Sequence, residues 1–236
     1  MKLKFLLFFT LLSAVASAQT ESPTSKLTIL SIDGRIMDLK YESVGAIETV
    51  YAFKNQRSEP FEYRGPQTVV FFRELSQTDE NGNPLRLEVA TCQLPTSGGQ
   101  YLLIISKLEG EKEAYRAFPI EDNWDTFSAG TYRFLNLAPF TIALKLDETV
   151  YKIEKLNFTD VSGNFENNTH KTAIMVSLPD GEDPTLIFEG LMYYTENQRM
   201  LYIISPKSGG RPGRVSMTAV PEVVPTKNSA AVPSAQ

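Results

Sequence analysis

The chain has few of the side chains on which common catalytic and metal sites depend. Its 236 residues include one cysteine, Cys92, one histidine, His170, and one tryptophan, Trp124. A Ser-His-acid triad or a Cys-His pair would have to use His170, and no serine lies in a G-x-S-x-G sequence. Zinc and copper sites usually take several His or Cys ligands. We therefore expect no enzyme activity, no cofactor and no metal ion, and we expect His170 to be a surface loop residue.

A single cysteine also excludes a disulfide within the chain. Cys92 lies in "LRLEVATCQL", where Ala90, Cys92 and Leu94 fall on one face of an extended segment. This pattern predicts a small buried apolar side chain. A reactive thiol or an intermolecular bridge is the alternative.

Both ends of the chain have the composition of segments outside a folded domain. "MKLKFLLFFTLLSAVASAQT" has a positive start, a short apolar run and Ala16-Ser17-Ala18, which is typical of a secretory signal peptide over 1–18. A retained anchor is the alternative, but the apolar run is well short of the roughly 20 residues that span a bilayer. We expect a periplasmic or extracellular protein with a disordered tail over 222–236.

Excess basic charge is also absent. The formal net charge is −5, and removal of Lys2 and Lys4 with the signal peptide makes it −7. Nucleic acids and anionic lipid surfaces are bound by clustered lysine and arginine. We therefore predict no nucleic-acid partner and no stable membrane insertion after cleavage. The partner would be an envelope protein or a polysaccharide.

Helical periodicity is absent, and short extended segments alternate with turns. "TIALKLD" (141–147) alternates apolar and polar residues, and "NGN" (81–83) and "PDGEDP" (179–184) are turn sequences. Strands of this length and spacing predict an all-β fold of sandwiches or barrels. We expect two tandem immunoglobulin-like antiparallel β-sandwich domains.

Two internal similarities support a tandem arrangement. "YAFKN" (51–55) is similar to "YRFLN" (132–136), and "YLLIIS" (101–106) is similar to "MLYIIS" (200–205). We place the N-terminal domain at 19–121, a linker at 122–130 and the C-terminal domain at 131–221. One larger all-β domain is the alternative, because β-strands use the same few residue types and two short matches can arise by chance.

Aromatic residues are the candidates for a binding surface. Trp124 lies in the linker, where it either packs at the domain junction or forms a stacking platform for a sugar. Neighbouring strand residues point to opposite faces, so we expect one of Phe71 and Phe72, and one of Tyr193 and Tyr194, to face outward or into an inter-domain seam. The predicted ligand-binding residues are Trp124, Tyr193 and Tyr194.

Carboxylates leave two further alternatives open. "TDENGN" (78–83) and "DGEDP" (180–184) carry oxygens that suit Ca²⁺, without the spacing of an EF-hand, and turn chemistry accounts for the same residues. A hydrolase would need only a pair of carboxylates at the right separation.

The segment "GTYRFLNLAPFTIALKLDETVYKI" (130–153) resembles a repeated sandwich module of exported bacterial proteins of unknown function. Its R-x-x-N opening is similar to a strand of the periplasmic alginate O-acetylation accessory proteins. The matching positions are Arg133, Phe134, Asn136, Leu137, Leu144 and Asp147. The resemblance implies a fold and a compartment, and it carries over no catalytic residue. Together these features predict a non-catalytic exported binding or scaffold protein of the bacterial cell envelope, in the first instance a protein-interaction module. The alternatives are a carbohydrate-binding module that uses exposed aromatics and a hydrolase.

Overall fold

The computed structural model describes residues 24–108, 110, 113–162, 170–178, 183–207 and 215–224. The predicted signal peptide (1–18) lies outside this part, as do 225–236 of the predicted tail and 180–182 of the second acidic turn. The predicted start of the tail was wrong, because Glu222 and Val223 belong to the last strand.

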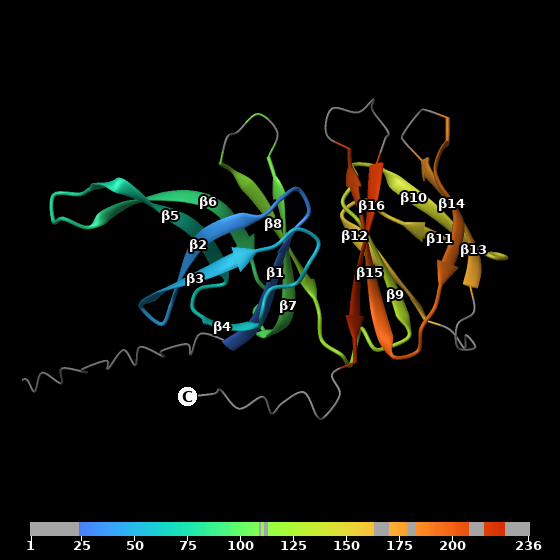
Figure 1. Ribbon diagram of the computed structural model, residues 1–236, viewed down its shortest axis with the longest axis horizontal. Helices are drawn as coiled ribbons and strands as arrows, with labels where there is room; N and C mark the ends of the chain where they lie inside the picture. The colour runs from blue at the N-terminus through green and yellow to red at the C-terminus, as the bar shows by residue number, and fades with distance from the viewer. Residues whose placement is uncertain are drawn as a thin grey trace, which may run out of the picture.

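The described residues form strands and no α-helix, which confirms the all-β prediction (Figure 1). The N-terminal strands are β1 (Thr24–Ser31), β2 (Ile36–Ser43), β3 (Ala46–Ala52), β4 (Phe61–Arg64), β5 (Thr68–Thr78), β6 (Pro84–Gln93), β7 (Gly99–Lys107) and β8 (Tyr115–Glu121). The C-terminal strands are β9 (Thr131–Asn136), β10 (Thr141–Leu146), β11 (Thr149–Ile153), β12 (Asn157–Ser162), β13 (His170–Leu178), β14 (Thr185–Tyr193), β15 (Gln198–Pro206) and β16 (Val215–Val223).

Each set of strands forms two four-stranded sheets, so the chain is two tandem β-sandwiches of immunoglobulin-like architecture. The N-terminal sheets have the orders β4-β1-β7-β8 and β3-β2-β5-β6, and the C-terminal sheets have the orders β12-β9-β15-β16 and β11-β10-β13-β14. The same strand order therefore occurs twice, shifted by eight strands. The pairs β1–β7 and β9–β15 are parallel, and the other strand pairs are antiparallel.

The strand order shows which of the two internal similarities joins equivalent strands of the two domains. "YLLIIS" lies in β7 and "MLYIIS" in β15, and these strands hold the same place in their sheets. "YAFKN" begins in β3, whereas "YRFLN" lies in β9, whose counterpart is β1. The Tyr51–Tyr132 similarity was therefore the wrong correspondence. It arose because strands of different position draw on the same apolar residues.

The four sheets stack in the order outer, inner, inner, outer, with β1, β7 and β8 beside β9, β15 and β16 (Figure 1). The central strands β7 and β15 of the inner sheets are buried on both faces, which explains their uninterrupted apolar runs. In β7, Leu103 and Ile105 face the core of their own sandwich, and Leu102 and Ile104 face the other domain.

An apolar seam joins the two sandwiches. Its buried side chains come from both inner sheets and from the segment between them: Leu30, Leu102, Ile104, Ile120, Phe127, Leu135, Leu201, Ile203 and Val220. Separating the sandwiches would expose this surface to water, and burial of apolar surface is the main stabilising term in folding. The seam therefore holds the two domains as one body.

Candidate functional site

The N-terminal outer sheet opens between its two hairpins. The β2–β3 hairpin closes in a two-residue turn at Val44 and Gly45, with φ of 52° and 76°, and such values are required by the tight turns of hairpins. The β5–β6 hairpin is longer and turns at 79–83. Between β2 and β5 the only register pair is Lys40 with Phe72. On either side of this pair the two strands separate.

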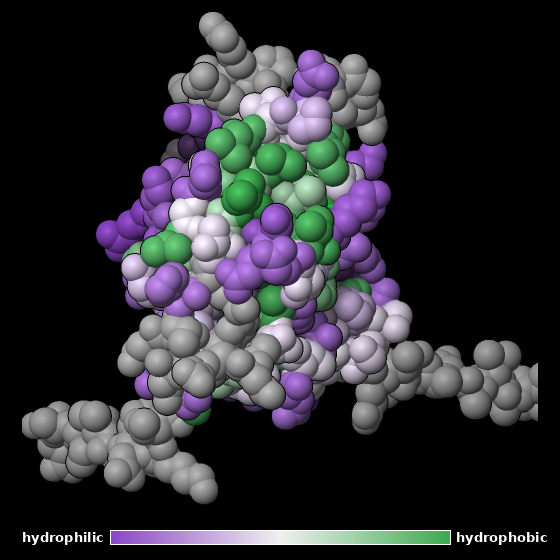
Figure 2. Space-filling view, turned by 90° about the vertical axis from the view of Figure 1, so that its right-hand side faces the viewer, coloured by the Kyte–Doolittle hydropathy of each residue, from purple (hydrophilic) through white to green (hydrophobic). Residues whose placement is uncertain are grey.

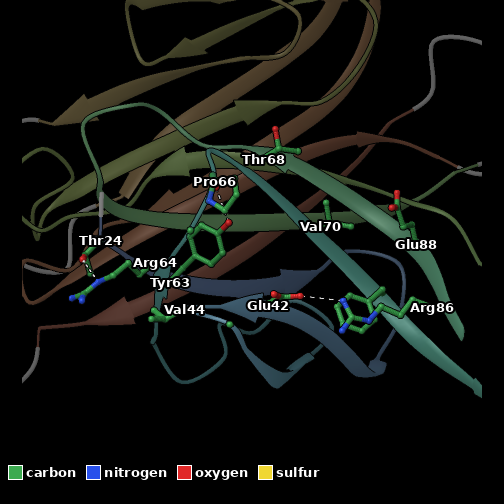
Figure 3. A pocket seen from close by; sticks show the side chains of 13 residues that line it. Thr24, Glu42, Val44, Tyr63, Arg64, Pro66, Thr68, Val70, Arg86 and Glu88 are labelled. Atoms are coloured by element: carbon green, nitrogen blue, oxygen red, sulfur yellow. Dashed lines mark hydrogen bonds and ion pairs between the residues drawn. The ribbon is translucent and has the colours of Figure 1, made fainter. Parts of the chain in front are cut away.

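The separation leaves a cavity of about 910 Å³, which we call the β2–β5 cavity (Figure 3). Its lining comes from β1, β2, β4, β5, β6 and the turns between them: Thr24, Glu42, Val44, Gly45, Tyr63, Arg64, Gly65, Pro66, Thr68, Val70, Phe72, Arg86 and Glu88. Pockets for small ligands typically measure about 300–1,000 Å³, so this cavity is large enough for one.

Tyr63 supplies a polar group to this cavity from an otherwise buried side chain. Its hydroxyl donates a hydrogen bond of 2.6 Å to the carbonyl of Pro66. Burial raises the pKa of Tyr63, with a smaller contribution from Cys92, so the hydroxyl stays protonated at neutral pH. The ring packs in the core of the sandwich, and the residue also lines the cavity.

Four exposed charged side chains line the β2–β5 cavity at its opening to solvent, which we call the mouth: Glu42, Arg64, Arg86 and Glu88. Arg86 forms an ion pair of 3.1 Å with Glu42 across the gap between β6 and β2, and its guanidinium lies 4.5 Å from the centre of the Phe72 ring (Figure 3). Arg64 donates to the Thr24 hydroxyl at 3.0 Å. Neither Arg64 nor Glu88 forms an ion pair with another residue of the part of the chain that the structure describes. The mouth therefore offers one uncompensated cation and one uncompensated anion.

Trp124 lies at the domain junction and is half-buried. The guanidinium of Arg199 covers one face of its ring, with 3.9 Å between its central carbon and the ring centre. The structure therefore shows packing at the junction through the face that Arg199 covers, and the sugar platform stays a prediction for the other face.

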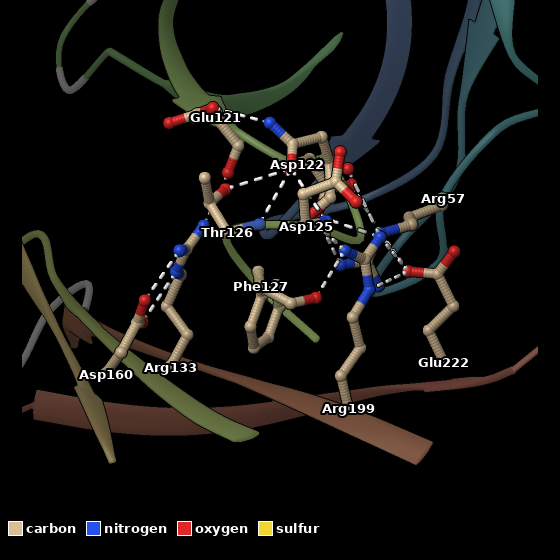
Figure 4. A network of polar contacts seen from close by, with 11 residues as sticks. Arg57, Glu121, Asp122, Asp125, Thr126, Phe127, Arg133, Asp160, Arg199 and Glu222 are labelled. Carbon is tan, nitrogen blue, oxygen red and sulfur yellow. Dashed lines mark hydrogen bonds and ion pairs between the residues drawn. The ribbon is translucent and has the colours of Figure 1, made fainter. Parts of the chain in front are cut away.

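Arg199 is the centre of a buried polar network at this junction (Figure 4). It forms ion pairs with Asp122 at 3.2 Å and Glu222 at 2.6 Å, and Arg57 of the N-terminal domain pairs with the same two carboxylates. Arg199 also donates to the backbone carbonyls of Asp122, Asn123 and Phe127. Desolvation lowers the pKa of Arg199, and the two carboxylates oppose that change.

A second buried arginine holds the other side of the same segment. Arg133 forms two hydrogen bonds of 2.7 Å with Asp160, donates to the carbonyl of Glu121, and lies 4.3 Å from the Phe127 ring centre. Residues 122–130 are therefore fixed from both sides and are not a free linker.

Tyr193 and Tyr194 have opposite environments, as the alternation of strand residues predicts. Tyr193 is 63% exposed on β14, and Tyr194 is 6% exposed in the core of the C-terminal sandwich. Tyr194 therefore offers no binding surface. Phe71 and Phe72 are both buried, and Phe72 is covered on its outer side by Arg86.

Tyr193 lies on the outer sheet of the C-terminal domain, far in the fold from Trp124. Figure 2 looks onto this side of the molecule and shows apolar side chains gathered among polar ones. The exposed apolar residues of these strands are Val150, Leu186, Leu191 and Tyr193. The structure therefore does not bring the three predicted binding residues together.

The remaining predicted sites have ordinary roles where they are described. Asp79 accepts backbone hydrogen bonds from Asn81 and Asn83, which also lower its pKa, so it stabilises the turn. His170 begins β13 and its ring lies 5.8 Å from that of Tyr193, so the prediction of a loop was wrong. Within the described ranges there is no group of three or more potential metal ligands, and no helix there is long and apolar enough to cross a membrane.

Comparisons of the chain with family models and with curated proteins found no match. The resemblance of the C-terminal half to alginate O-acetylation accessory proteins stays a prediction. In the structure, Asn136 of that pattern is buried and donates to the carbonyls of Phe140 and Ile153, so it stabilises the fold locally.

Proposed function

We propose that the protein is a non-catalytic, exported binding or scaffold protein of the bacterial cell envelope, and that it binds a protein partner at the β2–β5 cavity. The β2–β5 cavity is the observation that supports this proposal. It is formed by β-strands of a rigid sandwich, and binding sites built on rigid elements hold their geometry without a large entropic cost on binding.

The rest of the molecule suits a scaffold. The apolar seam and the Arg199 network fix the two sandwiches to each other, so a partner at the N-terminal end has a defined position relative to the C-terminal outer sheet. Export follows from the predicted signal peptide, and the acidic composition favours protein partners over nucleic acid.

Site-specific photo-crosslinking tests the proposal. A benzophenone amino acid replaces Val70 inside the cavity, and in a matched control it replaces Thr49, which is exposed on β3 at the other edge of the same sheet. After irradiation in envelope extract, we expect a defined protein adduct with the Val70 probe and none with the Thr49 probe.

Two results would contradict this. One is the absence of any adduct at Val70 from extracts of cells that express the protein. The other is an adduct whose added mass is an oligosaccharide, which would move the function to the carbohydrate-binding class.

A further inference from the structure

The backbone of β5 has unpaired polar groups at the β2–β5 cavity. The amide of Leu94 donates to the carbonyl of Gln67 at 2.8 Å, so Gln67 faces β6. In an antiparallel pair, successive residues direct their N–H and C=O groups alternately to the two sides of the strand. The groups of Thr68 and Val70 therefore point away from β6, into the cavity that both residues line.

The backbone of β2 also directs polar groups into the cavity, from the wall opposite β5. The two-residue turn at Val44–Gly45 makes Ser43 and Ala46 the closing pair of the β2–β3 hairpin. Glu42 therefore directs its N–H and C=O away from β3. The Val44 amide, two residues on, points to this same side and donates to the carbonyl of Arg64 at 3.0 Å.

Among the described strands, none pairs with Glu42, Thr68 or Val70 on the cavity side. Unpaired N–H and C=O groups along strand edges bind another extended chain by strand addition. We propose that the ligand of the β2–β5 cavity is an extended segment of a protein partner, which enters as an additional strand between β2 and β5. This inference rests on the proposed function and specifies how the partner is recognised.

The charges at the mouth define the chemistry of that segment. Arg64 and Glu88 lack ionic partners among the described residues, and they come from β4 and β6 on different sides of the cavity. Opposite charges across an interface fix register and orientation. The segment therefore carries an acidic side chain that contacts Arg64 and a basic side chain that contacts Glu88.

The Glu42–Arg86 ion pair lies at the mouth and is about half-exposed on both sides. Exposed pairs of this kind contribute little to stability, because water screens the two charges. An incoming strand can therefore displace this ion pair at little cost in free energy.

Proline substitution tests strand addition directly. Val70→Pro removes an N–H that points into the cavity and keeps the hydrogen bonds between β5 and β6. Thr49→Pro is the matched control, because Thr49 also directs its N–H to a free edge of the same sheet. The probe is a phage-displayed library of random nine-residue peptides, selected on the mature chain, and the selected peptides are then synthesised.

We expect the selected peptides to bind Val70→Pro at least tenfold more weakly than the wild type, and Thr49→Pro within twofold of it. Hydrogen exchange of the Glu42, Thr68 and Val70 amides in the wild type should slow at least tenfold on peptide binding, which gives a readout even where a proline variant fails to fold. Arg64→Glu should weaken binding of peptides with an acidic residue, and Glu88→Lys that of peptides with a basic residue.

Three results would overturn strand addition: equal binding to Val70→Pro, protection of amides elsewhere only, or a library that yields no peptide. If the Val70 photo-crosslinker still captures a protein in those cases, the proposed function stands and the partner is recognised through side chains. If it captures none, the proposed function falls as well.

Discussion

The guanidinium of Arg199 lies over the ring of Trp124, with 3.9 Å between its central carbon and the ring centre. Arg199 comes from β15 of the C-terminal domain, and Trp124 comes from the segment that connects the domains. The contact ties the connection to the second sandwich, because the same guanidinium also binds the backbone carbonyls of Asn123 and Phe127.

Trp124→Ala should destabilise the fold. A desolvated cation–π contact contributes about 2 kcal/mol, so we expect the free energy of unfolding to fall by about that amount. Urea unfolding followed by circular dichroism measures it, since the variant has no tryptophan for fluorescence. Trp124→Phe keeps a ring under Arg199 and should lose less. Unchanged stability with loss of glycan binding on an array would restore Trp124 as a sugar platform.

Arg199→Ala should cost more than the loss of Trp124. It removes one partner of a buried ionic network and leaves Asp122 and three carbonyls short of donors, and breaking such a pair costs about 3–5 kcal/mol. Arg199→Lys restores the charge but not the planar array of donors, so it should recover only part of the loss. Arg116→Ala on the surface is the control, and we expect a change within about 0.5 kcal/mol. Equal effects of Arg199→Ala and Arg116→Ala would refute a stabilising role for the network.

The segment 122–130 should resist proteolysis in the folded protein. Its backbone is held by Arg133 and Arg199, and Phe127 is buried in the seam, whereas proteases cut exposed and mobile loops. Limited digestion with a low-specificity protease, followed by mass spectrometry, should therefore give no cut there. Ile203→Asp places a charge in the seam and should make the segment cleavable. Two stable halves released from the wild type would show instead that the domains fold independently.

The sequence was sufficient to predict the all-β fold, because outer strands such as β10 alternate and central strands of the inner sheets such as β7 are continuously apolar. "TIALKLD" (141–147) alternates since one face of β10 is buried and the other is on the surface. "YLLIIS" (101–106) does not, since β7 is covered on both sides. The sequences of β7 and β15 are similar because both strands are covered on both sides and are apolar throughout. The spurious Tyr51–Tyr132 match arose because strands in different positions use the same few residue types.

The site was much harder to predict. The β2–β5 cavity arises from the angle at which two hairpins separate, and no residue pattern in β2 or β5 specifies that angle. The arginines of the junction did leave a signal. Arg133 and Arg199 each lie inside or next to an apolar strand, in "TYRFLN" and "NQRMLY". An arginine at such a position must be paired when it is buried, which points to a structural network.

Stability should fall in alkaline solution, and Cys92 should account for part of the fall. Burial raises the pKa of the Cys92 thiol from 9.0 to about 12, and burial also raises the pKa of Tyr41 to about 12. Because these groups lose their protons more readily in the unfolded chain, their stabilisation is complete below pH 9 and is lost as the pH rises from 9 to 12. Ionisation of the thiol alone lowers the free energy of unfolding by up to about 1.4 kcal/mol per pH unit in this window.

We expect urea unfolding of Cys92→Ala to show a shallower decline in stability from pH 9 to 11 than the wild type. We also expect the native thiol to react with a disulfide reagent at pH 8 far more slowly than the thiol of the unfolded chain. Parallel declines in the two proteins, or fast reaction of the native thiol, would place Cys92 at the surface.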